Sequence, residues 1–255
     1  MAADIDISVR ISDALAAEEI RSWESMESLS RVGRICSSRP WTEVARKSDG
    51  IATTFFRVYV GERLVAGTTG DLMPAGISDH YNAETLMAGN SITKGVTPWS
   101  ASESLMPCMT STTRAGKSAD VRVARGMKVT EQLKYITELF KALRAHGAAN
   151  GAVSSALLFS PRDSAPVSTA AQSADFIGTP IAESYYMELN CSTFEEYLQR
   201  FSSHKRRNIR REHSRGNQNA GVKYETKPLS DALDSHARFA AMNFSKYGEV
   251  STFAV

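Results

Sequence analysis

Two kinds of apolar pattern alternate along this chain, and their order limits the folds open to it. β-Branched and aromatic residues fill positions 53–60, Gly61 and Glu62 follow, and positions 64–67 are again apolar, which predicts a β-hairpin. Further strand patterns lie at 6–11, 119–124, 152–159, 183–189 and 222–226, and helix patterns lie at 13–29, 130–145, 167–176 and 229–247. Strands that alternate with helices in this way are typical of an α/β fold.

Small residues predict where two of these helices begin and end. Ser12 and Asp13 offer N-cap side chains for the helix at 13–29. Gly147 follows the helical pattern at 130–145 and is expected to end it, because glycine readily adopts the left-handed conformation of a helix cap.

The segment at 70–117 shows neither a strand pattern nor a helix pattern. It is rich in Gly, Ser, Thr, Met and Pro and contains the aromatic residues Tyr81 and Trp99. A loop of this length inside a compact domain usually has a function. We therefore expect an ordered loop that faces a substrate, with Tyr81 and Trp99 as candidates for an acceptor pocket.

Cysteine, histidine and apolar residues are placed in ways that exclude several classes of protein. Cys36, Cys108 and Cys191 lie far apart and form no CxxC pair, so we expect reduced, packed cysteines and no metal site. The first residues carry two acids and no apolar run, unlike a secretory signal. No apolar stretch approaches the ~18 residues of a membrane helix. These features predict a cytoplasmic protein without a membrane span.

Positive charge is concentrated in one short segment. Residues 204–215 hold six basic residues and one acid, which leaves 24 basic against 27 acidic residues elsewhere. Such a distribution favours a local anion site over a generally basic surface. Like charges four residues apart repel, and a bound anion would relieve that repulsion. The candidate phosphate-binding residues are Lys205, Arg206, Arg207, Arg210, Arg211 and Arg215.

A shorter amphipathic helix is predicted just before the basic segment. Ser192 and Glu195 have the spacing of a capping box, and Ser202 with Ser203 can cap the basic helix that follows. The apolar residues Phe194, Tyr197, Leu198 and Phe201 share one face, and we expect them to pack in a core.

Other interpretations of the basic helix remain open. A solvated basic face is the simplest, and Glu212 then only makes an ion pair within the helix. Binding of DNA is disfavoured, because no helix-turn-helix or zinc-finger pattern accompanies the cluster.

Three motifs in order resemble the FemAB-like proteins of the GNAT (N-acetyltransferase-like) superfamily. They are Tyr-Tyr-Met-Glu-Leu at 185–189, Phe-Glu-Glu-Tyr-Leu at 194–198 and Lys-Arg-Arg-Asn-Ile-Arg-Arg-Glu at 205–212. The similarity is close over 183–215, limited to the layout over 120–182, and loose before residue 120. Actinobacterial proteins of peptidoglycan biosynthesis are the most similar type.

The resemblance implies a mixed central sheet flanked by helices, with a first GNAT-like domain at 1–190, a helical linker at 191–216 and the start of a second, incomplete domain at 217–255. It implies a transferase that moves an aminoacyl or acyl group to an amine, in cell-wall or antibiotic biosynthesis. The donor would be aminoacyl-tRNA, with no tightly bound cofactor. The basic helix would then contact the phosphates of tRNA, which orient the donor without reading its sequence.

Two departures from the family pattern leave alternatives open. Residues 122–128 occupy the place of the acetyl-CoA loop but match its motif poorly, so acyl-CoA is the alternative donor. Residues 217–255 are too few to bury a core, so we expect either a truncated chain or a fold completed by a partner, such as a second copy. A non-catalytic module that binds RNA or phosphate is the third interpretation. The sequence identifies no catalytic base.

Overall fold

The computed structural model describes residues 6–29, 50–76, 82–88, 104–112, 119–160, 164–179 and 190–218, together with isolated positions beyond 218. The chain divides into two compact units, one of residues 1–182 with 239–255 and one of residues 183–238, and each is treated by itself. The strand predicted at 183–189 lies outside the described residues, as do the strand at 222–226 and the helix at 229–247 except for isolated positions.

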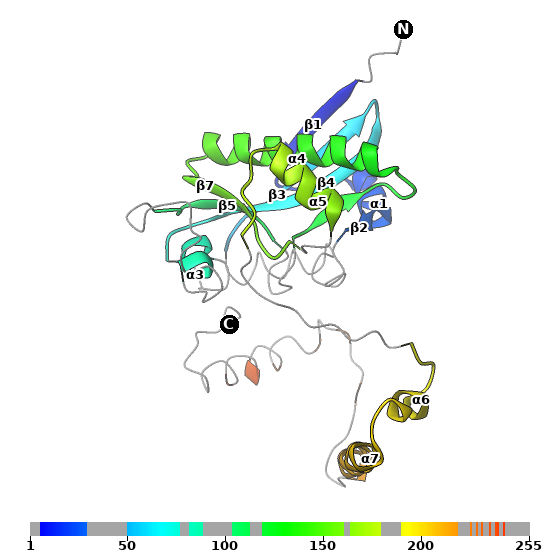
Figure 1. The fold of residues 1–255 in the computed structure, drawn as a ribbon. Helices are drawn as coiled ribbons and strands as arrows, with labels where there is room; N and C mark the ends of the chain where they lie inside the picture. The colour runs from blue at the N-terminus through cyan, green and yellow to red at the C-terminus, as the bar shows by residue number, and fades with distance from the viewer. Residues whose placement is uncertain are drawn as a thin grey trace. The chain divides into compact units, whose positions relative to one another are not determined.

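The first unit is built on a mixed sheet of seven strands (Figure 1). Its strands are β1 (Ile7–Ser12), β2 (Glu27–Ser28), β3 (Thr53–Val60), β4 (Arg63–Met73), β5 (Cys108–Ser111), β6 (Val121–Val123) and β7 (Ser154–Leu157). The order is β1-β3-β4-β5-β7, and β6 pairs with both β4 and β2. The β5–β7 pair is parallel and the other pairs are antiparallel.

The hairpin predicted at 53–67 is confirmed as β3 and β4. Gly61 has a positive φ of 56° in the turn, a conformation that glycine adopts without steric cost. β4 continues to Met73, beyond the predicted end at residue 67, because its far end pairs with β5. The prediction missed β5, which lies inside the segment that we expected to be a loop.

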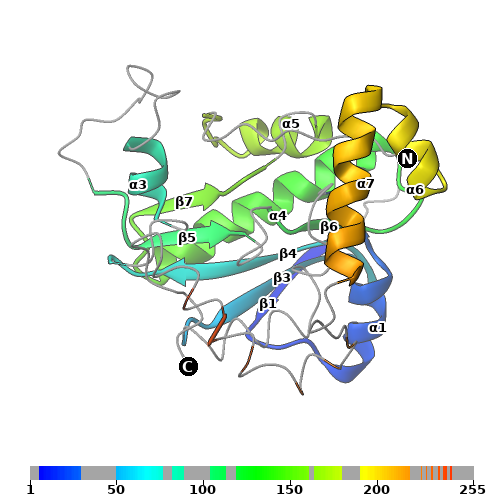
Figure 2. The same ribbon diagram turned by 90° about the horizontal axis from the view of Figure 1, so that it is seen from below.

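Helices cover both faces of the sheet. On one face, α4 (Val129–Ala149) packs with α5 (Ala165–Ser173) over a core that includes Phe56 and Val58 (Figures 1 and 2). On the other, α1 (Ala17–Ser25) buries Trp23 against Phe55 and Tyr59. Alternate residues of β3 thus face opposite cores, as the period of a strand requires. The predicted α/β fold with a mixed sheet flanked by helices is confirmed, and this layout is consistent with a GNAT-like fold.

Three predicted helix ends are wrong. The helix predicted at 13–29 ends at Ser25, because β2 (Glu27–Ser28) pairs with β6. β1 runs through Ser12, whose hydroxyl donates to the carbonyl of Ala14, so α1 begins only at Ala17. Gly147 lies inside α4 rather than at its end, and Asn150 is the C-cap. A Cβ at position 147 would lie 2.7 Å from the Cβ of Met109, so close packing of helix on sheet requires glycine there.

Other described segments complete the two units. A short helix, α3 (Ala83–Ala88), contributes Ala83 to a small cluster with Met73 and Cys108. Cys108 is therefore a packed, free cysteine, as expected. In the second unit, α6 (Phe194–Gln199) precedes α7 (Ser203–Gln218), which extends beyond the predicted 204–215.

Candidate functional site

The basic segment forms a helix, α7, that follows α6 after a short turn. The cap of α6 is shifted by one residue from the prediction. Thr193 Oγ1 accepts from the amide of Glu196 at 3.1 Å, and the Glu196 carboxylate accepts from the amide of Ser192 at 2.6 Å. Glu196 therefore takes the capping position that was predicted for Glu195. The predicted cap of α7 is confirmed, because Ser202 Oγ accepts from the amide of Lys205 at 3.4 Å.

One face of α7 is occupied by contacts with α6. Arg210 pairs with Glu195, and Arg206 donates to the carbonyl of Phe201 at 2.8 Å. The imidazole of His213 stacks on the ring of Phe194 with centroids 4.8 Å apart. The hydrogen bond from Arg210 lowers the pKa of Glu195. We call Arg206 and Arg210 the inner arginines, because Arg210 contacts α6 and Arg206 contacts the turn between the two helices.

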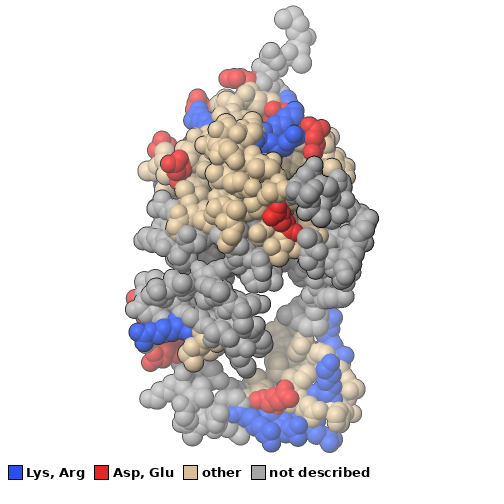
Figure 3. Space-filling model, turned by 90° about the vertical axis from the view of Figure 1, so that its left-hand side faces the viewer, with Lys and Arg blue, Asp and Glu red and all other residues tan. Residues whose placement is uncertain are grey.

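A second face of α7 presents cations outward. Arg207, Arg211 and Arg215 recur at every fourth position, are exposed, and make no ion pair with any residue that the structure describes. A helix turns 100° per residue, so these three span about 80° of the helix surface, and Arg207 and Arg211 each lie about 100° around the helix from the inner arginine that precedes them. Each step of four residues rises about 6 Å. Figure 3 shows Lys and Arg side chains gathered where this helix pair lies. We call these three residues the outer stripe.

Lys205 is intermediate between the two sets. Its ammonium lies 5.0 Å from the centre of the Phe201 ring, at a cation–π distance, yet the side chain remains exposed. The six predicted phosphate-binding residues therefore lie on one helix, but only the outer stripe is left without a described partner. A polyanion with regularly spaced charges suits such a stripe, because arginine forms bidentate contacts with phosphate.

The predicted acceptor residues Tyr81 and Trp99 lie outside the described residues, and the acceptor pocket stays a prediction. The poorly matched acetyl-CoA loop is described. It connects β6 to α4, has Gly126 at a φ of +73°, and places Lys128 at the N-cap of α4.

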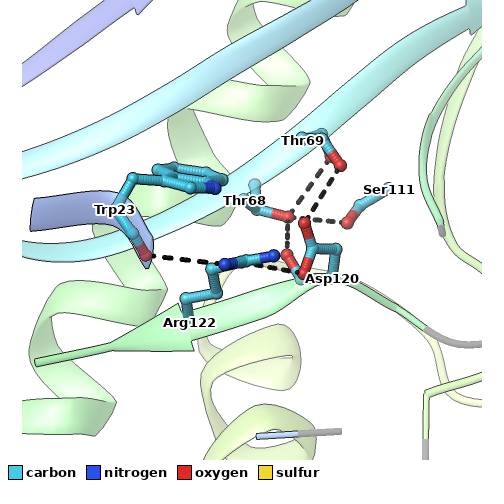
Figure 4. Close-up of polar contacts among 6 residues, drawn as sticks. All are labelled: Trp23, Thr68, Thr69, Ser111, Asp120 and Arg122. Carbon is cyan, nitrogen blue, oxygen red and sulfur yellow. Dashed lines mark hydrogen bonds and ion pairs between the residues drawn. The ribbon is translucent and has the colours of Figure 1, made fainter. Parts of the chain in front are cut away.

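A cluster of buried polar groups in the sheet was not predicted from the sequence. One edge of β4 pairs with β6 at Ala66–Thr68 and with β5 at Asp71–Met73, so the two partner strands diverge around residues 69 and 70. The hydroxyl of Thr68 lies 2.7 Å from that of Ser111 and donates to the carbonyl of Asp120 at 2.5 Å (Figure 4). We call the cluster of Thr68, Thr69, Ser111, Asp120 and Arg122 the polar split.

The carboxylate of Asp120 is at the centre of the polar split, and the residue is 1% exposed. It accepts from Arg122 Nε at 3.2 Å and from the hydroxyl of Thr69 at 3.5 Å. Burial raises the pKa of Asp120, and Arg122 and Thr69 offset only part of that shift. Arg122 also donates to the carbonyl of Trp23 at 3.5 Å and lies over its ring (Figure 4). These contacts join β4, β6 and the end of α1.

A sequence signal for this pair did exist. Asp120 and Arg122 are two residues apart in a strand pattern, so their side chains share one face, whereas the pattern shows Val121 and Val123 on the other. The sequence does not show that both faces of this short strand are buried.

Comparison with known proteins identifies the family. Residues 121–247 match the profile of the FemAB-like family, which is described as peptidoglycan biosynthesis/recognition. Through this segment the chain belongs to the FemAB-like family. Searches of curated proteins and of solved structures each returned no match. The family resemblance predicted from the sequence motifs is confirmed, and the matched segment of this FemAB-like chain includes α4, α6 and the whole basic helix α7.

The described residues contain neither a candidate metal site nor a candidate membrane-spanning helix. Within the described ranges, no group of three or more His, Cys, Asp or Glu side chains is arranged to hold a metal ion. No described helix is both long and apolar enough to cross a bilayer.

Proposed function

We propose that this FemAB-like chain transfers an aminoacyl group from aminoacyl-tRNA to an amine acceptor in cell-wall or natural-product biosynthesis. The observation that carries the proposal is the outer stripe of Arg207, Arg211 and Arg215 within the segment that matches the family. An exposed row of arginines fits a donor that carries a regular series of phosphates better than it fits a single small anion.

The reaction is the aminolysis of an activated ester. The amine nitrogen attacks the ester carbonyl carbon, the bond from that carbon to the ribose oxygen breaks, and the ribose hydroxyl leaves with a proton that originates on the amine. The outer stripe would hold the donor through its phosphates, away from the reacting bond. Binding energy of this kind is used to position the ester against the amine, which removes much of the entropic barrier.

The loop between β6 and α4 favours a second candidate, an acyl-CoA-dependent N-acyltransferase. The loop ends at the N-terminus of a 21-residue helix. Unpaired backbone N–H groups at such a terminus bind phosphate in many proteins. The first candidate is preferred because the loop does not match the acetyl-CoA motif, whereas the basic helix lies within the family match.

Incubation of the full chain with labelled donors would test the proposal. Aminoacyl-tRNA with a labelled amino acid and acyl-CoA with a labelled acyl group would be supplied separately, each with an amine-bearing peptidoglycan precursor peptide. We expect label on the peptide from aminoacyl-tRNA only. Label from acyl-CoA only would favour the second candidate. Binding of tRNA without transfer of label would indicate a non-catalytic RNA-binding module.

A further inference from the structure

A histidine lies in line with the arginines of the outer stripe. His204 is three residues before Arg207 in α7, and its side chain is exposed. A helix turns 100° per residue, so His204 lies about 20° around the helix from both Arg211 and Arg215. It therefore falls within the roughly 80° of surface that the outer stripe spans, and it extends the stripe by about 4.5 Å toward the start of the helix.

The contacts between α6 and α7 are made on the other side of α7 (Figure 2). Arg210 pairs there with Glu195, and His213 stacks on the ring of Phe194. Arg210 lies about 120° around the helix from His204, and His213 lies about 180° from it. The two histidines of α7 thus face in opposite directions. His213 is held against α6, whereas the imidazole of His204 contacts no partner among the residues that the structure describes.

The charged groups of the helix pair leave the charge of His204 to be set by a ligand. Its nearest charged neighbours along the chain are all cations, namely Arg200, Lys205 and Arg207. The acids are engaged or distant: Glu195 pairs with Arg210, Glu196 caps α6, and Glu212 lies about 12 Å further along the axis of α7. Within the described part of the chain, none of these carboxylates contacts His204.

Protonation of His204 gives the outer stripe a fourth cation. Histidine is the side chain whose charge ordinarily changes between pH 5 and 8. An opposite charge close by favours the protonated form of an imidazole, and a phosphate bound along the stripe supplies that charge. Because the protonated form is the one that attracts phosphate, affinity should rise as pH falls and level off once the imidazole is fully protonated.

We propose that His204 is a fourth, pH-dependent cation of a site on α7 for a phosphate-bearing polyanion. The proton comes from the solvent and adds to the ring nitrogen that is unprotonated in the neutral imidazole. This inference rests on the proposed function in that both use the outer stripe. It adds a binding residue and a pH response that the proposed function does not require.

Titration of the full chain with deacylated tRNA at pH 5.5 and pH 8.0, at one salt concentration, tests the proposal. Long-chain inorganic polyphosphate is the second probe, because it carries phosphates without ribose or bases. His204→Gln should bind about fivefold more weakly than wild type at pH 5.5, the size of one exposed ion pair, and should match wild type at pH 8.0. His204→Arg carries a permanent cation, so it should bind about fivefold more tightly than wild type at pH 8.0 and match it at pH 5.5.

His213→Gln is the matched control, because it removes the histidine on the opposite side of the same helix. It should keep the wild-type ratio of affinities between the two pH values. Salt dependence gives a second measurement: the slope of log K against log salt should be steeper by roughly 0.7–0.9 at pH 5.5 than at pH 8.0 in wild type, and His204→Gln should lack this increase. Circular dichroism would confirm that the helices are retained in each variant.

The outcomes separate this proposal from the proposed function. If tRNA binds and wild type and His204→Gln respond equally to pH, the proposal is overturned and the proposed function stands. If polyphosphate binds with the response that depends on His204 and tRNA does not bind, the proposal is supported and the tRNA donor is contradicted. Failure of wild type to bind either probe at pH 5.5 would overturn both.

Discussion

Replacing Arg122 by Met tests whether the polar split is held together by a buried ion pair. The side chains of Asp120 and Arg122 are 2% and 8% exposed, and Nε and Oδ1 are 3.2 Å apart. The methionine removes the cation but leaves the carboxylate buried. Loss of one partner from such a pair costs about 3–5 kcal/mol, a large fraction of the roughly 5–15 kcal/mol that stabilises a typical domain.

The loss of stability in Arg122→Met should depend on pH, and the direction of this dependence follows from the pKa of Asp120. Its pKa in the folded protein is already raised by burial, and Arg122 opposes that shift. Without Arg122 the folded pKa rises further above the unfolded value of about 3.9. Stability from this group is fully present below the unfolded pKa and is lost as pH rises through the folded pKa. The difference in free energy of unfolding between wild type and variant should therefore decrease as pH falls. It should change by up to about 1.4 kcal/mol per pH unit between the folded-state pKa values of Asp120 in the two proteins.

Urea denaturation followed by circular dichroism at pH 8 and pH 5 would measure the effect. The double variant Asp120→Asn with Arg122→Met is the control, because it leaves no unpaired charge. It should be more stable than Arg122→Met alone at pH 8, and its difference from that variant should shrink at pH 5. A loss below about 1 kcal/mol at pH 8, or a loss independent of pH, would refute the reasoning.

Two further predictions concern the close packing of Gly147 and the burial of Cys108 in the first unit. Gly147→Ala should lower the free energy of unfolding by up to about 2 kcal/mol, because crowding against Met109 costs about 1–3 kcal/mol while the gain in helix propensity is about 1 kcal/mol. Urea denaturation measures this change, and a stabilised variant would contradict the close packing. Burial raises the pKa of the Cys108 thiol to about 11, whereas Cys191 is partly exposed. Iodoacetamide at pH 8 should therefore modify Cys191 and spare Cys108 until urea is added. Peptide mass spectrometry measures the labelling, and equal labelling of both cysteines in the native protein would contradict the prediction.

The parts of the fold that could be predicted were those with strong local patterns. The hairpin at β3 and β4 has a β-branched run and a two-residue turn, and α4 has a regular apolar stripe. β5 could not be predicted, because Cys108–Ser111 is short and has no alternating pattern, and its burial arises from pairing with β4 and β7. The start of α1 was misplaced because pairing with β3 extends β1 through Ser12, which outweighs the local capping preference.

The residues of the candidate site could be predicted from the sequence, but their arrangement in space could not. The density of arginine in 204–215 identified the helix, and the sequence motifs identified the family. The separation into inner arginines and an outer stripe depends on where α6 packs, and that contact arises from Glu195 and Phe194. The polar split required tertiary structure, since it joins residues from at least three elements.

The role of the outer stripe can be tested most directly by the salt dependence of tRNA binding. The affinity of the full chain for tRNA would be measured between 50 and 200 mM salt for wild type and for the triple variant with Arg207, Arg211 and Arg215 changed to Gln. Each lost phosphate contact should reduce the slope of log K against log salt by roughly 0.7–0.9, so the triple variant should be shallower by about 2–3. A control with the same change in net charge replaces the exposed residues Arg63, Lys134 and Lys141 by Gln and should keep the wild-type slope. An unchanged slope in the stripe variant, or an equal change in both, would contradict the assignment of the outer stripe as the donor-binding surface.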